Sequence, residues 1–415
     1  FYGTFLRRPR AWDNCQQQQQ QKLPQVAGRT RFHLKFKKYG HLVFCQIKTK
    51  QMRKYLLAIC LFIPVVSAAQ ERLNYSLRLE PVWARVADAM GETGSVESIE
   101  FSPDAKYLVS GTKYDNSVVM WRTSDGAELW RKYAEEEVER VGWSADGRFV
   151  AAGSEDFLVT IFNAQTGEVF KVIEHDQGID GLTWSGKGAL LATGEEKIEL
   201  PNGKLQGWIR IFDVDKDKEV KKIDFGNTVN ELFFTQDDRY LLAVGHGAVK
   251  VYQTSDWSLV QTLKTDHYTV FTSGVFSPDG KHVFAVGQGG TSRGNAYLWE
   301  WESGKLLKMF NHTGRKIESV SWHPNGQYIA HAGHDPYIYI YRVADIIAYR
   351  NDNIRVAFKI WAGDHAEYID FNADGSFLAS AHQNGLVKLW VWMGEDPDLN
   401  SNRHSKLLDT QTGQN

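Results

Sequence analysis

Hydrophobic and polar positions alternate in short runs along residues 80–392, and one pattern recurs seven times. Each copy has an apolar run that ends in an aromatic residue, then a polar turn, then a second apolar run. The seven aromatic residues are Phe101, Trp143, Trp184, Phe234, Phe276, Trp322 and Phe371. They are separated by 42, 41, 50, 42, 46 and 49 residues. Short alternating runs bounded by turn residues predict β-strands, and regular recurrence predicts a repeat fold.

Each copy continues with two further predicted strands. The turn between the first two strands has, for example, the form Ser277-Pro278-Asp279-Gly280. Pro presets one dihedral angle of such a turn, and Asp and Gly tolerate the others. The third strand ends in a second aromatic residue, which is Trp121, Phe162, Phe212, Tyr252, Trp299, Tyr341 or Trp390. A fourth run, such as residues 305–309, completes the unit. Four short strands in roughly 40–45 residues are typical of a propeller blade.

These copies resemble the WD-repeat family over about residues 80–392, although only Phe212-Asp213 keeps an Asp after the third-strand aromatic. The resemblance implies an all-β fold, a seven-bladed β-propeller with four antiparallel strands per blade. The seventh copy ends after its third strand, near Trp392. Because an open ring would leave strand edges unpaired, we expect residues 81–86 to supply the missing outer strand and close the ring.

The resemblance also implies a structural hydrogen-bond set of His, Ser or Thr, Asp and Trp within a blade. The matching residues here are Asp115, Asp156, Asp335, His175, His267, Trp121, Trp299 and Trp390. We therefore interpret these histidines as structural and not as metal ligands.

The chain ends are predicted to lie outside the propeller. Residues 52–69 have the pattern of a signal peptide: two basic residues, an apolar run, and Ser67-Ala68-Ala69 at the cleavage site. The apolar run is shorter than the ~20 residues of a membrane-spanning helix, so no stable membrane insertion is expected after cleavage. We interpret 1–51 as an upstream or leader segment absent from the mature protein, 70–392 as the propeller and 393–415 as a disordered tail. This organisation predicts a secreted or periplasmic protein.

The positions of the cysteines and the distribution of charge exclude several kinds of site and partner. All three cysteines precede residue 70, so disulfides, Cys-ligated zinc and a Cys nucleophile are excluded from the mature chain. Residues 1–69 carry 13 of the 48 basic residues and one of the 50 acidic residues, which leaves a net charge of −14 on residues 70–415. An acidic body repels phosphate backbones, so we expect no nucleic-acid partner.

Catalytic and metal motifs do not emerge from the sequence. There is no Gly-x-Ser-x-Gly elbow, no His-Glu-x-x-His and no phosphate-binding loop. Asp213, Asp215 and Asp217 open like a calcium loop, but Lys218 stands where that loop needs Gly. Zinc binding by the late histidines would require side chains from different blades to meet. We therefore expect no catalytic residue, no cofactor and no metal, and a protein that is not an enzyme.

The resemblance places one residue per blade at the mouth of the central channel. These residues are Glu97, Glu139, Asp180, Asn230, Thr272, Glu318 and Glu367. Flanking contact positions are Glu137, Glu155, Tyr114, Lys316 and His334. Like charges around one opening repel each other, so a cation or basic partner would relieve them; a solvated rim is the alternative.

The leading hypothesis is a monomeric, non-enzymatic scaffold outside the cytoplasm. It would bind a protein or peptide, for example a basic one, through the top face of the propeller. The partner-binding candidates are Glu97, Glu139, Asp180, Glu318, Glu367, Glu137, Glu155, Tyr114 and His334. The alternatives are a lactonase-like or quinoprotein-like propeller enzyme with a metal at the channel mouth, and a binder of carbohydrate or of the cell envelope.

Overall fold

The computed structural model describes residues 79–188, 190–289, 294–311, 314–348, 354 and 356–394, and the backbone of residues 38–39 and 42–43. The chain divides into a unit of residues 1–71 and a unit of residues 72–415. In the first unit, β1 (Lys38–Tyr39) pairs with β2 (Leu42–Val43). Otherwise the predicted leader, the signal peptide and the tail beyond residue 394 lie outside the described residues. Among the described residues, no helix is long and apolar enough to cross a membrane.

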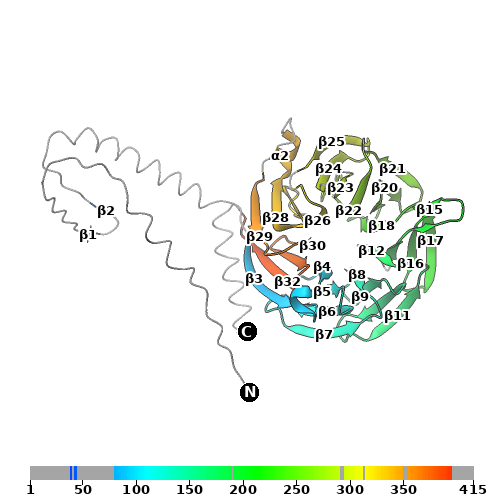
Figure 1. The fold of residues 1–415 in the computed structure, drawn as a ribbon, viewed down its shortest axis with the longest axis horizontal. Coiled ribbons are helices and arrows are strands. Elements are labelled where there is room, and N and C mark those ends of the chain that lie inside the picture. Colours follow the sequence, from blue (N-terminus) through cyan, green and yellow to red (C-terminus); the bar gives the residue numbers. More distant parts are fainter. Residues whose placement is uncertain are drawn as a thin grey trace, which may run out of the picture. The chain divides into compact units, whose positions relative to one another are not determined.

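The second unit is a seven-bladed β-propeller, as predicted (Figure 1). Each blade is a four-stranded antiparallel sheet whose first strand lines the centre of the ring. Blade 1 contains β4 (Val96–Phe101), β5 (Tyr107–Thr112), β6 (Ser117–Arg122) and β7 (Glu128–Tyr133). Blade 2 contains β8 (Val138–Trp143), β9 (Phe149–Ser154), β10 (Leu158–Asn163) and β11 (Val169–Glu174). Blade 3 contains β12 (Ile179–Trp184), β13 (Leu190–Glu195), β16 (Trp208–Asp213) and β17 (Lys218–Asp224).

The remaining blades follow the same order. Blade 4 contains β18 (Val229–Phe234), β19 (Tyr240–Gly245), β20 (Ala248–Gln253) and β21 (Leu259–Leu263). Blade 5 contains β22 (Thr269–Phe276), β23 (His282–Gly289), β24 (Gly294–Glu300) and β25 (Lys305–Phe310). Blade 6 contains β26 (Ile317–Trp322), β27 (Tyr328–Gly333), β28 (Asp335–Arg342) and β29 (Phe358–Trp361). Blade 7 contains β30 (Ala366–Phe371), β31 (Phe377–His382), β32 (Leu386–Trp392) and β3 (Leu79–Val86).

The ring is closed by the N-terminal strand, as the sequence predicted. Strand β3 pairs antiparallel with β32, from Leu79 opposite Trp392 to Val86 opposite Leu386. The Trp83 side chain is buried, and its Nε1 donates a hydrogen bond to the Thr123 carbonyl of blade 1 at 2.8 Å. The last blade is therefore built from both ends of the propeller sequence and is linked to the first blade. Closure pairs the edge of β32 that would otherwise be free.

The hydrophobic core is divided among the junctions between blades. Seven buried clusters fill the seven junctions between neighbouring blades. At the junction of blades 1 and 2, for example, Val109 and Met120 pack with Val141, Trp143 and Phe162. Each sheet therefore buries both faces against its neighbours, which explains why the strands are apolar on both sides. Packing of this kind gives the central channel rigid walls.

The turn after the inner strand has the same hydrogen bonds in blades 1, 2, 4 and 5. In blade 1, Ser102 Oγ donates to Asp104 Oδ1 at 2.7 Å and accepts from the Tyr107 amide at 3.0 Å. Asp104 Oδ1 also accepts from the Lys106 amide at 3.1 Å. The same arrangement recurs at Ser144, Thr235 and Ser277. The repeated Ser-x-Asp phrase thus fixes the link between the first two strands of a blade.

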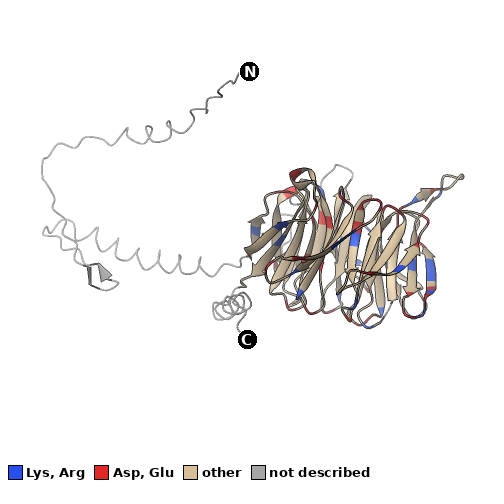
Figure 2. Ribbon diagram, turned by 90° about the horizontal axis from the view of Figure 1, so that it is seen from below, with Lys and Arg blue, Asp and Glu red and all other residues tan. Residues whose placement is uncertain are grey.

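Two insertions interrupt this regularity. In blade 3, β14 (Ile198–Glu199) and β15 (Leu205–Gln206) form a hairpin that projects from the ring (Figures 1 and 2). In blade 6, the short helix α2 (Val343–Ala348) follows β28 and buries Ile346. A 3-10 turn, η2 (Gly91–Thr93), precedes the first inner strand. Both insertions overlap segments of the sequence, 195–206 and 344–365, that are longer than a blade requires.

Candidate functional site

A β-bulge in every inner strand turns one side chain into the mouth of the channel. The pairing register of the first two strands shifts at the same point in all seven blades, for example between Val96 and Ser98 in blade 1. The residues skipped by these shifts are Glu97, Glu139, Asp180, Asn230, Thr272, Glu318 and Glu367. A bulge re-aims the extra residue and leaves it out of the ladder. The backbone therefore gathers these seven positions at one level.

The same seven residues line one cavity of about 210 Å3. The other lining residues are Arg140, His246, Val270 and Lys316. We call the five acids of this set, Glu97, Glu139, Asp180, Glu318 and Glu367, the acidic mouth. The structure thus brings together five of the partner-binding candidates, although their role in binding stays a prediction.

Arg140 also lines this cavity and was not predicted. Its Nε donates to the Asp180 carbonyl at 3.0 Å and its Nη2 to the Asn230 carbonyl at 2.9 Å. Its guanidinium lies 4.7 Å from the Tyr368 ring centre, and Tyr368 donates a hydrogen bond to Glu231 at 3.1 Å. Arg140 therefore connects blade 2 with blades 3, 4 and 7 across the channel. The cavity thus also contains a buried cation, whose Nη1 lies 3.9 Å from Glu231 Oε1.

Burial raises the pKa values of most mouth carboxyls. Removal from water raises the pKa of Asp180 to about 7, and the Glu196 carboxylate adds to the effect. Burial raises the pKa of Glu367 to about 8, with the Glu318 charge as the next cause. Burial also raises the pKa of Glu139 well above its ordinary value, followed by the effect of Glu97. Since each group resists ionisation beside the others, a cation in the pocket would favour their charged forms.

Lys113 partly compensates the charge on the side of blades 1 and 2. Its Nζ lies 2.6 Å from Glu137 Oε2 and 3.6 Å from Glu139 Oε1. Glu155 follows in the turn after β9, where burial and then the Asp180 charge raise its pKa to about 7. Tyr114 is exposed in the turn after β5. Glu137 and Glu155 thus extend the acidic mouth outward, while Tyr114 is open to contact.

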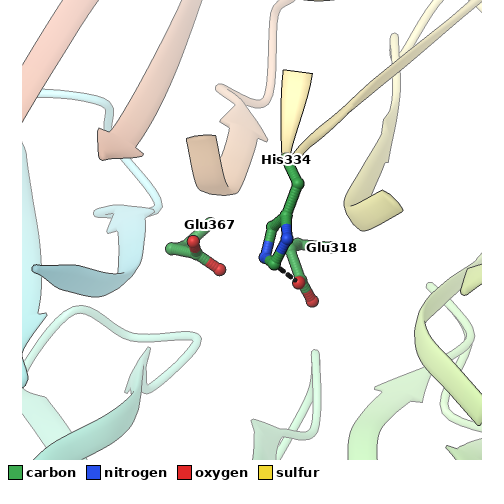
Figure 3. A group of neighbouring side chains, drawn as sticks. All are labelled: Glu318, His334 and Glu367. Atoms are coloured by element: carbon green, nitrogen blue, oxygen red, sulfur yellow. Dashed lines mark ion pairs between the residues drawn. The ribbon is translucent and has the colours of Figure 1, made fainter. Parts of the chain in front are cut away.

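His334 and Lys316 compensate the charge on the opposite side. Glu318 Oε1 lies 2.8 Å from both Lys316 Nζ and His334 Nε2. Burial alone would raise the pKa of Glu318, but the contacts with His334 and Lys316 hold it below its ordinary value. Glu367 faces the same group from blade 7 (Figure 3).

The hydrogen-bond set of His, Ser or Thr, Asp and Trp that the resemblance implies is found in part. Trp121 Nε1 donates to Ser110 Oγ at 3.0 Å, and Trp390 Nε1 donates to Ser380 Oγ at 2.8 Å. Trp299 Nε1 instead bonds the Lys264 carbonyl at 3.4 Å.

The acidic and imidazole members of the set differ from blade to blade. Asp115 accepts from Ser117 at 2.8 Å and Asp156 from the Leu158 amide at 2.9 Å, whereas Asp335 hydrogen-bonds to Tyr339. His175 is buried against Thr193, with 2.9 Å between Nε2 and Oγ1, but His267 is exposed.

The described fold and pocket define a closed seven-bladed propeller with an acidic channel mouth. Comparison with models of protein families then indicates which class of propeller the chain resembles. A model described as "Anaphase-promoting complex subunit 4 WD40 domain" matches residues 108–187. A model described as "WD domain, G-beta repeat" matches residues 86–122, 304–342 and 365–391. These matches, made to blades of the described fold, support a WD-repeat protein.

Similar proteins include several named subunits of complexes. The chain is 25% identical to THO complex subunit 3 of Arabidopsis thaliana over 264 residues, which are 61% of this chain and 78% of that protein. It is 25% identical to protein hir1 of Schizosaccharomyces pombe over 56% of this chain but 28% of that protein. It is 21% identical to the target of rapamycin complex subunit wat1 of the same yeast, over 53% of this chain and 65% of that protein. Such relatives support a protein-interaction scaffold.

The expectation of a secreted or periplasmic protein is wrong. The relatives are eukaryotic and include subunits of the THO complex, the target of rapamycin complex, COMPASS and translation initiation factor 3. None of these names describes a secreted or periplasmic protein. The signal-peptide interpretation of residues 52–69 stays a prediction, because those residues lie outside the described part of the chain.

Proposed function

We propose that the chain is a non-enzymatic scaffold that binds a basic segment of a protein partner at the acidic mouth. The observation that carries the proposal is the convergence of five acids from five blades on one pocket. Named complex subunits among the relatives support a protein as the partner. A rigid ring that presents many turns at once suits such a role.

The pocket favours insertion of a side chain over binding of a free substrate. Its volume of about 210 Å3 lies below the roughly 300–1,000 Å3 of pockets that enclose a drug-sized ligand. A Lys or Arg side chain would bring its charge between Glu97, Glu139 and Asp180 while its backbone stays on the top face. Charge complementarity across an interface contributes to specificity, and a Lys or Arg inserted here would face buried carboxyls. We therefore expect the mouth to select the partner by charge.

Affinity capture with matched variants tests this function. The mouth variant carries E97Q, E139Q and D180N; the control carries E168Q, D215N and E302Q, three exposed acids that do not line the pocket. Tagged proteins would be incubated with a eukaryotic lysate, and retained proteins quantified by mass spectrometry. Partners retained by the wild type should fall at least tenfold with the mouth variant and remain with the control. Equal retention by all three proteins would refute the proposed site.

A further inference from the structure

A histidine and two carboxylates from blades 6 and 7 converge at one side of the pocket (Figure 3). Glu318 lies in β26, His334 in the turn between β27 and β28, and Glu367 in β30. Each offers one ligand atom, and these atoms all lie within 4.8 Å of one another. The three residues come from two neighbouring blades, and the packing of β26 against β30 brings them together. Imidazole nitrogen and carboxylate oxygen are common ligands of zinc and related ions.

The imidazole of His334 is held in place by neighbouring groups. The His334 amide donates to the Lys316 carbonyl at 3.0 Å. The His334 ring stacks on the His365 ring, with 5.1 Å between centroids and 9° between planes. His365 Nδ1 lies 2.8 Å from Gln383 Oε1, and Gln383 also hydrogen-bonds to Glu367. Supporting contacts of this kind orient the ligands of metal sites.

Glu367 supplies a second, independent observation. Its Oε1 atom is buried and has no hydrogen-bond partner among the described residues. Its carboxylate points toward His334 and Glu318 (Figure 3). The carboxyl group hydrogen-bonds to Gln383, but burial of its Oε1 without a partner costs free energy because that atom has lost its contact with water. A cation bound between the three side chains would provide the missing contact.

We propose that Glu318, His334 and Glu367 form a binding site for one divalent transition-metal ion of the zinc type. The donors of a tetrahedral zinc ion lie roughly 3.3 Å apart, so small side-chain rotations suffice from separations within 4.8 Å. A fourth position toward the pocket stays open to water or to a group from a partner. Lys316, which is 31% exposed, lies 2.8 Å from Glu318 Oε1 and must swing toward solvent as the ion enters.

Metal titration of the full chain tests the site without any protein partner. After chelator treatment and desalting, Zn2+ would be titrated by calorimetry and Co2+ by visible absorption, whose bands report the ligand geometry. One ion per chain is expected. H334A and E367Q should each weaken binding at least tenfold. H267A removes an exposed histidine outside the pocket and should leave the affinity unchanged.

A further variant separates coordination from general damage to the fold. K316M removes the ammonium that competes for Glu318 and should strengthen Zn2+ binding about three- to tenfold, a gain that misfolding does not produce. Circular dichroism would check that each variant keeps its strands. Uptake of no ion, or wild-type affinity in both H334A and E367Q, would overturn the site. The E97Q/E139Q/D180N variant should still bind one ion, so failure of the metal site and failure of the partner site are distinguishable.

Discussion

Two opposing electrostatic effects determine the pKa of each carboxyl group at the mouth. Burial favours the neutral form of a carboxyl, while Arg140 and Lys113 favour its charged form. At Asp180 burial dominates, since the pKa is raised to about 7 despite both cations. The balance differs at Glu318, where two direct contacts hold the pKa down. Neighbouring positions in one ring thus carry different charges near neutral pH.

Asp180 should make the protein less stable as the pH rises from about 4 to 7. Its folded-state pKa of about 7 lies above the ordinary value of 3.8, so the folded state holds the proton more strongly over this interval. Stability that depends on this proton is present at low pH and is lost as pH rises through 7. D180N should therefore flatten the decline of melting temperature between pH 5 and pH 8, and it also removes a charge that raises the pKa of Glu155.

Calorimetric melting at several pH values measures this slope. Glu137, Glu196, Arg140 and Lys113 face Asp180 and should keep their places in D180N. D215N changes an exposed aspartate outside the pocket and should keep the wild-type slope. If the slope were as steep in D180N as in the wild type, Asp180 would be ionised in the folded protein, and the prediction would be contradicted.

At this scale the resemblance to the WD-repeat family located the mouth, but Arg140 was missed. The repeated aromatic residues aligned the copies, and the resemblance then implied Glu97, Glu139 and Asp180; the structure places a bulge at the same position in these blades. Strict alternation would send Arg140, the neighbour of Glu139, to the opposite side of the strand. The bulge breaks this alternation, so Glu139 and Arg140 both line the pocket. A recurrent bulge leaves no mark in residue types, and Arg140 was missed for that reason.

Single strands are joined within a blade by buried polar networks that vary between copies. In blade 7, Ser380 Oγ accepts from Trp390 Nε1 and donates to His382 Nε2, both at 2.8 Å. Burial lowers the pKa of His382 to about 3, so its imidazole is neutral and can accept. In blade 1 the equivalent Ser110 Oγ accepts from Trp121 Nε1 at 3.0 Å, and Thr112 stands at the position of His382. The network in blade 7 therefore satisfies one more buried group.

Replacing Ser380 should be more damaging than replacing Ser110. S380A leaves both Trp390 Nε1 and His382 Nε2 without their partner, and each unsatisfied buried group costs about 1–3 kcal/mol. S110A leaves one such group, so its loss of stability should be about half as large. Urea unfolding monitored by tryptophan fluorescence compares the two variants with the wild type. Equal losses would mean that the contact with His382 adds nothing to blade 7.

At the scale of elements, prediction succeeded where hydrophobic pattern and turn chemistry agree. The turn residues after the first strand and the aromatic residues that end the first and third strands located the strands of each blade. The insertions were recognised only as excess length. The hairpin β14–β15 and the helix α2 depend on contacts within irregular segments, such as the pairing of Ile198 with Gln206. No repeated copy exists against which such a segment can be aligned.

The whole propeller is a closed ring in which neighbouring inner strands contact each other from β4 round to β30 and back to β4. The expected contribution of residues 81–86 follows from counting, because the seventh copy lacks one strand. Their register was not foreseeable, since it shifts between Pro81 and Trp83. Packing of the neighbouring blades 6 and 7 through β26 and β30 explains how Glu318 and Glu367 come to share one side of the pocket.

Location is a whole-molecule property that the sequence pattern predicted wrongly. The apolar run before Ser67 predicts an export signal, yet the named relatives are subunits of the THO complex, the target of rapamycin complex and translation initiation factor 3. Hydrophobicity and length describe how a segment partitions, and they do not identify the machinery that recognises it. The net charge of −14 on residues 70–415 does not depend on that interpretation. Five of these acids line one pocket, and the proposal of a basic partner rests on them.

The central claim is that a basic side chain of the partner enters the acidic mouth. A structure of the chain in complex with a partner retained in the affinity capture tests this claim most directly. Electron cryomicroscopy of the complex would locate the bound segment on the propeller. The expected result is a Lys or Arg side chain inside the pocket, in contact with at least two of Glu97, Glu139 and Asp180. A partner bound along the outer strands, with no residue entering the pocket, would contradict it.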